Sequence, residues 1–125
     1  AGGYSEDGAG NRTADDSAVI VDVGARTAES RLKFLKTARY GASIAAVKND
    51  LVICGGVGTA GAPLSDCELF SLDGTPLPDG QVVPLPTPRA YHLMLPLEND
   101  LAILVGGITT KDGVTAPTLD IYTAR

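Results

Sequence analysis

The chain has no tryptophan, a single histidine and only two cysteines among its 125 residues. No His or Cys stands near the two cysteines to complete a tetrahedral metal site, so neither a metal nor another cofactor is expected. No apolar run approaches the roughly 20 residues of a membrane-spanning helix, and no membrane span is expected. Ten Lys and Arg residues against fifteen Asp and Glu residues leave no basic face for phosphates. This balance excludes nucleic acid as a partner.

Glycine, proline and apolar residues are what the sequence has in quantity. The 15 glycines and 8 prolines stand between short apolar runs, and 44% of the residues are hydrophobic. This punctuation is typical of an all-β chain with frequent turns. The segment 30–40 could be drawn as a basic amphipathic helix, but its alternation of Leu32 and Phe34 suits a strand equally well.

Several markers recur at a spacing of about 50 residues. "TARYGAS" at 37–43 returns as "TPRAYHL" at 87–93, and "KND" at 48–50 returns as "END" at 98–100. Glycine pairs stand at 2–3, 55–56 and 106–107, and "DCELFSLD" at 66–73 aligns with "DSAVIVDV" at 16–23. One period predicts four strands, over 41–48, 51–55, 66–72 and 80–85. With 17–22, 31–36 and three strands after residue 88, nine are expected in all.

The repeat resembles the kelch repeat of β-propeller proteins. That family has an Arg before the first strand, a second strand ending in Gly-Gly, and a third strand that carries an aromatic residue. The matching positions are Arg39, Gly55, Gly56, Asp66 and Phe70 in one copy, and Arg89, Gly106, Gly107 and Tyr122 in the next. His92 falls where kelch sequences often have a His. The family's fourth-strand Trp is absent, so Phe34, Leu77, Val83 or Leu85 must fill the space between blades.

The resemblance implies propeller blades of four antiparallel strands. Residues 1–38 would end one blade, 39–88 would form a complete blade, and 89–125 would form most of a third. Because a ring has typically 4 to 8 blades, this is a partial ring. It needs further blades, either from the rest of a longer protein or from other copies of the chain.

Cys54 and Cys67 lie on the second and third strands of one expected blade, about equally far from the connecting loop. A cross-strand disulfide is geometrically plausible, and two buried free thiols are the alternative. A disulfide would indicate an extracellular or periplasmic location, whereas free thiols would fit the cytoplasm. The glycine pairs, Arg39, Arg89 and His92 are interpreted as structural, and no catalytic residue is assigned.

The preferred function is a non-catalytic scaffold that binds a protein or a glycan. The segments after the glycine pairs, about 4–15, 57–65 and 108–116, are expected to be long loops on one side of the ring. They offer six candidate binding residues: Tyr4, Glu6, Asp7, Thr59, Lys111 and Asp112. One alternative is a segment of a larger secreted oxidase or sugar-processing enzyme whose catalytic residues lie elsewhere. The other is a purely structural assembly module.

Overall fold

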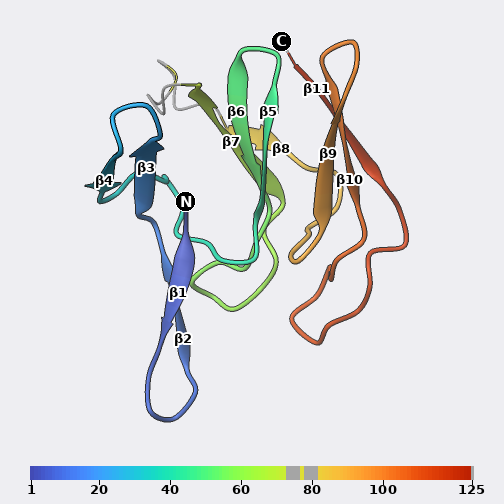
Figure 1. Ribbon diagram of the computed structural model, residues 1–125. Helices are drawn as coiled ribbons and strands as arrows, with labels where there is room; N and C mark the ends of the chain where they lie inside the picture. Colours follow the sequence, from blue (N-terminus) through green and yellow to red (C-terminus); the bar gives the residue numbers. More distant parts are fainter. Residues whose placement is uncertain (73–76, 78–81, 125) are drawn as a thin grey trace.

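The computed structural model describes residues 1–72, 77 and 82–124, and these residues form β-strands joined by turns and loops. Eleven strands lie in four small antiparallel sheets (Figure 1). From left to right in that view, a two-stranded sheet is followed by a four-stranded middle sheet and a three-stranded C-terminal sheet. The expected all-β architecture is confirmed, and none of these sheets closes on itself within the described residues.

The middle sheet pairs its four strands in chain order: β5 (Ser43–Val47), β6 (Asp50–Cys54), β7 (Asp66–Ser71) and β8 (Val82–Pro84). Asp50 pairs with Val47 across a two-residue turn, which makes β5 and β6 a tight hairpin. Because β6 lies inside the sheet and is covered on both faces, it is a nearly continuous apolar run.

The C-terminal sheet repeats the first three strands of the middle sheet. It consists of β9 (Leu93–Leu97), β10 (Leu101–Val105) and β11 (Asp120–Thr123). Leu93 pairs with Val105, just as Ser43 pairs with Cys54 in the middle sheet. The N-terminal region holds two hairpins, formed by β1 (Gly3–Glu6) with β2 (Arg12–Asp15) and by β3 (Ala18–Asp22) with β4 (Thr27–Arg31).

The prediction of a strand over 31–36 is wrong. The strand that pairs with β3 is β4, which ends at Arg31, and the residues after it turn. Leu32 is exposed, whereas Phe34 and Leu35 are both buried. Phe34 and Leu35 pack into the same buried cluster, whereas consecutive side chains of a strand point to opposite faces. The Leu32–Phe34 alternation therefore does not reflect an extended backbone.

The prediction of a long loop over 4–15 is also wrong, because this segment forms the β1–β2 hairpin. Glu6 pairs with Arg12, and the Asp7 carboxylate closes the turn by accepting the backbone N–H groups of Ala9 and Asn11, each at 2.9 Å. An Asp that bonds the backbone two residues ahead is a common turn-former. With this hairpin the described residues contain eleven strands rather than the expected nine.

The N-terminal copy of the repeat is shifted by one residue from the expected alignment. The Gly2 N–H donates to the Ser17 carbonyl. In the middle sheet the Gly55 N–H donates to the Asp66 carbonyl. Ser17 therefore corresponds to Asp66, at a spacing of 49 rather than 50. A one-residue shift exchanges the two faces of a strand, which is why Ala18 and not Ser17 is buried against the middle sheet.

Two apolar cores flank the middle sheet. The N-terminal core centres on the stacked rings of Phe34 and Phe70, 4.4 Å apart, together with Ala18, Leu35 and Ile53. The C-terminal core joins the middle and C-terminal sheets and contains both cysteines. Its buried members are Ala45, Val47, Val52, Cys54, Cys67, Leu69, Leu85, Met94, Ala102, Leu104 and Tyr122, with Leu77 and Val83 packed against them.

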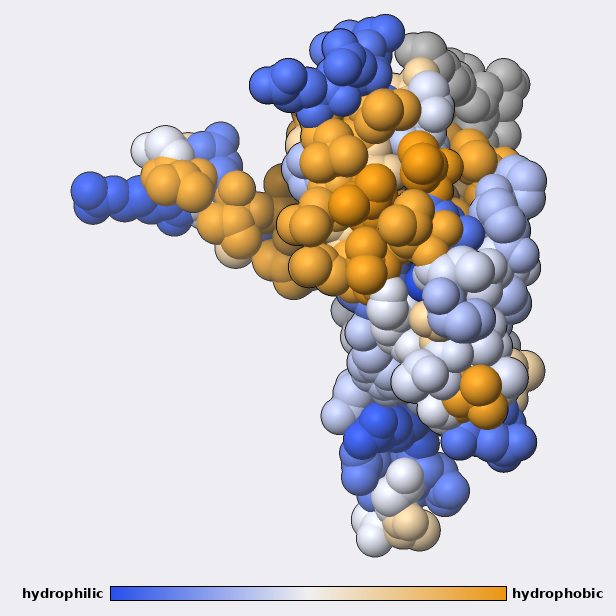
Figure 2. Space-filling view, turned by 90° about the vertical axis from the view of Figure 1, so that its right-hand side faces the viewer, coloured by the Kyte–Doolittle hydropathy of each residue, from blue (hydrophilic) through white to orange (hydrophobic). Residues whose placement is uncertain are grey.

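The far side of the C-terminal sheet is apolar and exposed. Figure 2 shows these side chains gathered over β9–β11. We call this surface the outer face; its exposed members are Leu93, Leu95, Leu97, Val105, Leu119 and Ile121. Exposed aliphatic patches of this kind on a folded domain commonly mark an interaction site.

Candidate functional site

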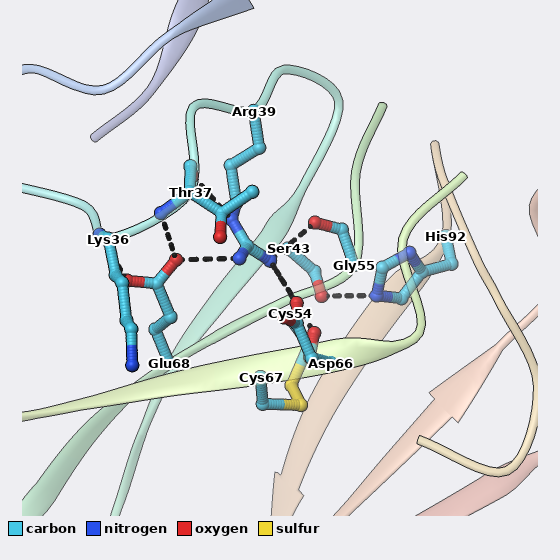
Figure 3. A network of polar contacts seen from close by, with 10 residues as sticks. All are labelled: Lys36, Thr37, Arg39, Ser43, Cys54, Gly55, Asp66, Cys67, Glu68 and His92. Carbon is cyan, nitrogen blue, oxygen red and sulfur yellow. Dashed lines mark hydrogen bonds and ion pairs between the residues drawn. A yellow bond between two sulfur atoms is a disulfide. The ribbon is translucent and has the colours of Figure 1, made fainter. Parts of the chain in front are cut away.

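Arg39, the residue before the first strand of the middle sheet, is fully buried. Its guanidinium donates to the Gly55 carbonyl at 2.9 Å and to a Glu68 carboxylate oxygen at 2.6 Å, and it pairs with Asp66 at 2.9 Å (Figure 3). The Glu68 carboxylate also accepts the backbone N–H of Lys36 at 2.6 Å. The Arg39 side chain therefore links Gly55, the first glycine of the pair, to β7, the third strand of the middle sheet.

Arg89 repeats this arrangement in the C-terminal sheet. It is fully buried, donates to the Gly106 carbonyl at 3.0 Å and pairs with Asp120 at 2.9 Å. Its guanidinium also donates to the Thr118 carbonyl. We call this unit the arginine clamp: a buried Arg bonded to the first-glycine carbonyl and to a third-strand carboxylate.

The clamps hold charges that are removed from water but paired. Such a pair contributes little net stability, whereas deleting one partner strands the other charge and typically costs about 3–5 kcal/mol. Both clamps are closed on protein groups, and neither guanidinium offers a surface for a ligand, because both arginines are completely covered. Arg39 and Arg89 thus position the strand ends.

Gly55 and Gly106 differ in what surrounds them. Gly55 has φ +62°, and a Cβ there would collide with the carbonyl oxygen of Arg89, the clamp residue of the following sheet. Gly106 has φ +75°, but a Cβ there would meet nothing within 4 Å. The two glycines share a backbone conformation, but the space beside Gly55 is occupied by the following sheet and the space beside Gly106 is open.

His92 bridges the middle and C-terminal sheets. Its Nε2 lies 2.5 Å from the Ser43 hydroxyl oxygen (Figure 3), and the residue is almost completely buried. Burial, followed by the nearby positive charge of Arg89, lowers the pKa of His92 to about 4, so the ring is neutral at pH 7. Asp120 is bonded to Arg89 rather than to the imidazole. No described residue bonds the other ring nitrogen, Nδ1, so the Ser43–His92 pair lacks the orienting group of a catalytic triad within the described residues.

Cys54 and Cys67 form a disulfide, so the pairing considered from the sequence is confirmed. The two residues are direct partners on β6 and β7, with Cα atoms 4.0 Å apart. Both are fully buried in the C-terminal core, where the bond faces the C-terminal sheet. Its position between two packed sheets gives it a structural role.

The segments after the three glycine pairs gather at one end of the molecule. In Figure 1 the β1–β2 hairpin, the 57–65 loop and the 108–117 loop all point downward, whereas the β5–β6 and β9–β10 turns point upward. We call this end the Gly-Gly end. It carries all six candidate binding residues identified in the sequence.

The six candidates form separate groups on this end. Tyr4 and Glu6 are exposed on β1, while Asp7 is engaged in its turn, where hydrogen bonds led by Asn11 lower its pKa. Lys111 lies close to Gly61, so the 57–65 and 108–117 loops touch there. Thr59 and Asp112 are exposed at the tips of these two loops. Thus Tyr4 and Glu6 belong to one cluster and Lys111 to another.

Three tyrosines form a row that the sequence alone did not reveal. The Tyr40 ring centre lies 5.1 Å from that of Tyr4 and 6.4 Å from that of Tyr91. The Arg12 guanidinium lies 4.5 Å above the Tyr4 ring and pairs with Glu6 at 3.4 Å. We call Tyr4, Tyr40 and Tyr91 the tyrosine ledge. Because its members are 36 and 51 residues apart, only the repeat alignment, which sets Tyr91 against Gly41, could have indicated it.

The comparisons with known proteins assign no family. No protein-family model matches the chain, and no curated protein sequence matches it significantly. Among residues 1–72, 77 and 82–124, no group of three or more His, Cys, Asp or Glu side chains is placed to hold a metal ion. No helix long and apolar enough to cross a membrane occurs in that part of the chain.

Proposed function

We propose that this chain is a segment of a kelch-like β-propeller that acts as a non-catalytic binding scaffold. In this proposal the middle sheet is one blade, the C-terminal sheet is most of the next, and the β3–β4 hairpin is the end of the preceding one. The Gly-Gly end provides the ligand-binding surface. The buried disulfide supports an extracellular or periplasmic location.

The observation that carries the proposal is the correspondence between the outer face and an interface inside the molecule. The strand registers set Leu95 against Ala45, Ile103 against Val52, and Ile121 against Leu69. Ala45, Val52 and Leu69 are buried because the C-terminal sheet covers them. Their counterparts on the outer face have no such cover among the described residues.

The glycine pairs indicate what covers the outer face. The Gly56 N–H donates to the carbonyl of Arg89 at 2.8 Å, and the Gly3 N–H donates to the carbonyl of Arg39 at 2.9 Å. The glycine pairs at 2–3 and 55–56 are thus each bonded to the clamp residue of the following sheet. The open space at Gly106 fits another Arg-led sheet, supplied by more of the same protein or by another chain.

The Gly-Gly end is proposed as the binding surface because exposed side chains from three repeats lie there. Loops on a rigid β scaffold are the usual place for recognition residues. The non-catalytic reading is supported by His92, the only histidine, because it is buried between two sheets and engaged with Ser43.

An extended chain tests the scaffold. A second copy of residues 73–124 placed directly after Ala124 adds a sequence equivalent to β8 beside β11, and then an Arg89-led sheet against the outer face. We expect the melting temperature to rise by several degrees, because the added sheet buries large aliphatic side chains of the original outer face, each stabilising by about 1.5–3 kcal/mol when fully covered.

The matched control is the same extended chain with Leu95→Lys and Ile121→Lys in the original copy. These lysines extend from the outer face into the new contact, so the gain in melting temperature is expected to disappear. An added segment that leaves the melting temperature of the parent chain unchanged contradicts the scaffold proposal.

A further inference from the structure

Tyr91 has a backbone conformation that its side chain disfavours. Its φ is +56°, and its counterpart in the preceding repeat, Gly41, has φ +63°. For an L-residue the left-handed region costs about 1–2 kcal/mol, and glycine avoids this cost. The other non-glycine residues with positive φ among those described are polar or charged: Arg26, Lys33, Lys48, Asn99 and Asp100.

Burial of the Tyr91 side chain offsets little of the free-energy cost of this backbone conformation. The residue is 54% exposed, so much of its apolar surface stays in water. One side of the ring rests on Gly41, where a Cβ would come within 2.6 Å of a ring carbon. A strained residue with an exposed aromatic ring suggests selection for binding rather than for folding.

The neighbours of Tyr91 extend this ring into a surface. Tyr4, Tyr40 and Tyr91 come from three successive copies of the repeat, so the ledge exists only in the assembled fold. Tyr4 is 47% exposed, and the paired Arg12 and Glu6 stand beside it with about half of each side chain in solvent. The ledge thus combines aromatic rings with hydrogen-bond donors and acceptors.

We propose that the tyrosine ledge binds a neutral oligosaccharide, with a sugar ring stacked on Tyr91 and hydroxyl groups bonded to Arg12 and Glu6. This inference rests on the proposed binding role of the Gly-Gly end. Sugar rings present C–H groups on one side and hydroxyl groups at their rims. An aromatic face packs against the C–H groups. A guanidinium paired with a carboxylate offers hydrogen-bond donors and acceptors to the hydroxyl groups without a net charge.

The surroundings favour a neutral sugar chain over other ligands. The described surface contains no enclosed pocket, which fits a chain that lies along an open ledge rather than a small buried molecule. Glu6 beside the ledge, and the net charge of −5, oppose an acidic glycan. Glutamate is depleted in protein interfaces, whereas here Glu6 stands beside the rings in its ion pair with Arg12.

Tyrosine fluorescence of the 125-residue chain provides a direct test, because the protein has no tryptophan. The probes are three neutral hexasaccharides (cellohexaose, mannohexaose and chitohexaose) and the acidic hexagalacturonic acid. We expect at least one neutral probe to change the fluorescence saturably, and the acidic probe to bind at least tenfold more weakly.

Two variants test whether the sugar binds at the tyrosine ledge. Tyr91→Gly should weaken binding at least tenfold without lowering the melting temperature by more than a few degrees, because glycine relieves the strained backbone. Tyr122→Phe, which alters the buried tyrosine, should leave the affinity unchanged. The inference is overturned if none of the neutral probes changes the fluorescence, if Tyr91→Gly binds equally well, or if the acidic probe binds as tightly. A peptide or protein ligand bound at the Gly-Gly end in place of sugar also overturns it. None of these results affects the stability test of the scaffold.

Discussion

Removing the guanidinium of Arg39 should destabilise the protein far more than removing any exposed charge. In Arg39→Ala the Glu68 carboxylate remains buried between β7 and the Lys36 backbone, with its ion-pair partner gone. The Gly55 carbonyl loses a donor at the same time. An uncompensated buried charge costs about 3–5 kcal/mol. Since a domain of this size has a total stability of about 5–15 kcal/mol, the variant should lose a large fraction of it.

Urea unfolding followed by far-ultraviolet circular dichroism measures this loss. The matched control is Arg12→Ala, whose ion pair with Glu6 is about half exposed and should contribute less than about 1 kcal/mol. The double variant Arg39→Met/Glu68→Gln removes both buried charges and keeps an acceptor for the Lys36 N–H. It should therefore be more stable than Arg39→Ala by more than about 1 kcal/mol. If Arg39→Ala costs no more than Arg12→Ala, the clamp is not the structural element described above.

Three further outcomes follow from the same structure. Reducing the Cys54–Cys67 disulfide, whose partners are 13 residues apart, should lower the free energy of unfolding by about 3 kcal/mol, measured by thermal melting with and without reductant; an unchanged melting temperature would contradict this. Gly55→Ala should cost at least about 2 kcal/mol more than Gly106→Ala, because only the former meets a backbone carbonyl, and equal costs would refute the open space at Gly106. The folded-state pKa of His92, about 4, lies below the ordinary 6.5, so its contribution is present above pH 6.5 and is lost as the pH falls toward 4. The difference between the wild type and His92→Gln should isolate this loss, of at most about 3 kcal/mol, and parallel curves over that window would refute it.

The strands of the middle and C-terminal sheets could be predicted because their signals are local. β6 and β10 are apolar runs that stop at a glycine pair, and each observed strand ends on the residue before that pair. The cysteine pair was also accessible, since two residues about equally far from a connecting loop face each other on antiparallel strands. These features depend on period and spacing, which a sequence displays directly.

The N-terminal region was harder to predict because its structure depends on tertiary contacts. Phe34 is buried through its stack on Phe70, which lies 36 residues away, so its apparent alternation with Leu32 was misleading. The one-residue shift of the third strand becomes visible only in the hydrogen bond between Gly2 and Ser17.

The tyrosine ledge was missed for a related reason. Tyr4, Tyr40 and Tyr91 are far apart in the sequence, and Tyr40 and Tyr91 stand at different positions of the repeat markers at 37–43 and 87–93. The one available signal is that Tyr91 replaces a glycine of the preceding repeat, and its meaning depends on knowing that this position requires a positive φ.

Amide hydrogen exchange at Gly107 in the extended chain tests the central claim most directly. If a further Arg-led sheet covers the outer face, the Gly107 N–H should bond the carbonyl of the added clamp residue, just as the Gly56 N–H bonds that of Arg89. Its exchange should then slow at least a hundredfold relative to the 125-residue chain and approach the rate at Gly56. An exchange rate at Gly107 that is the same in both chains would contradict the account.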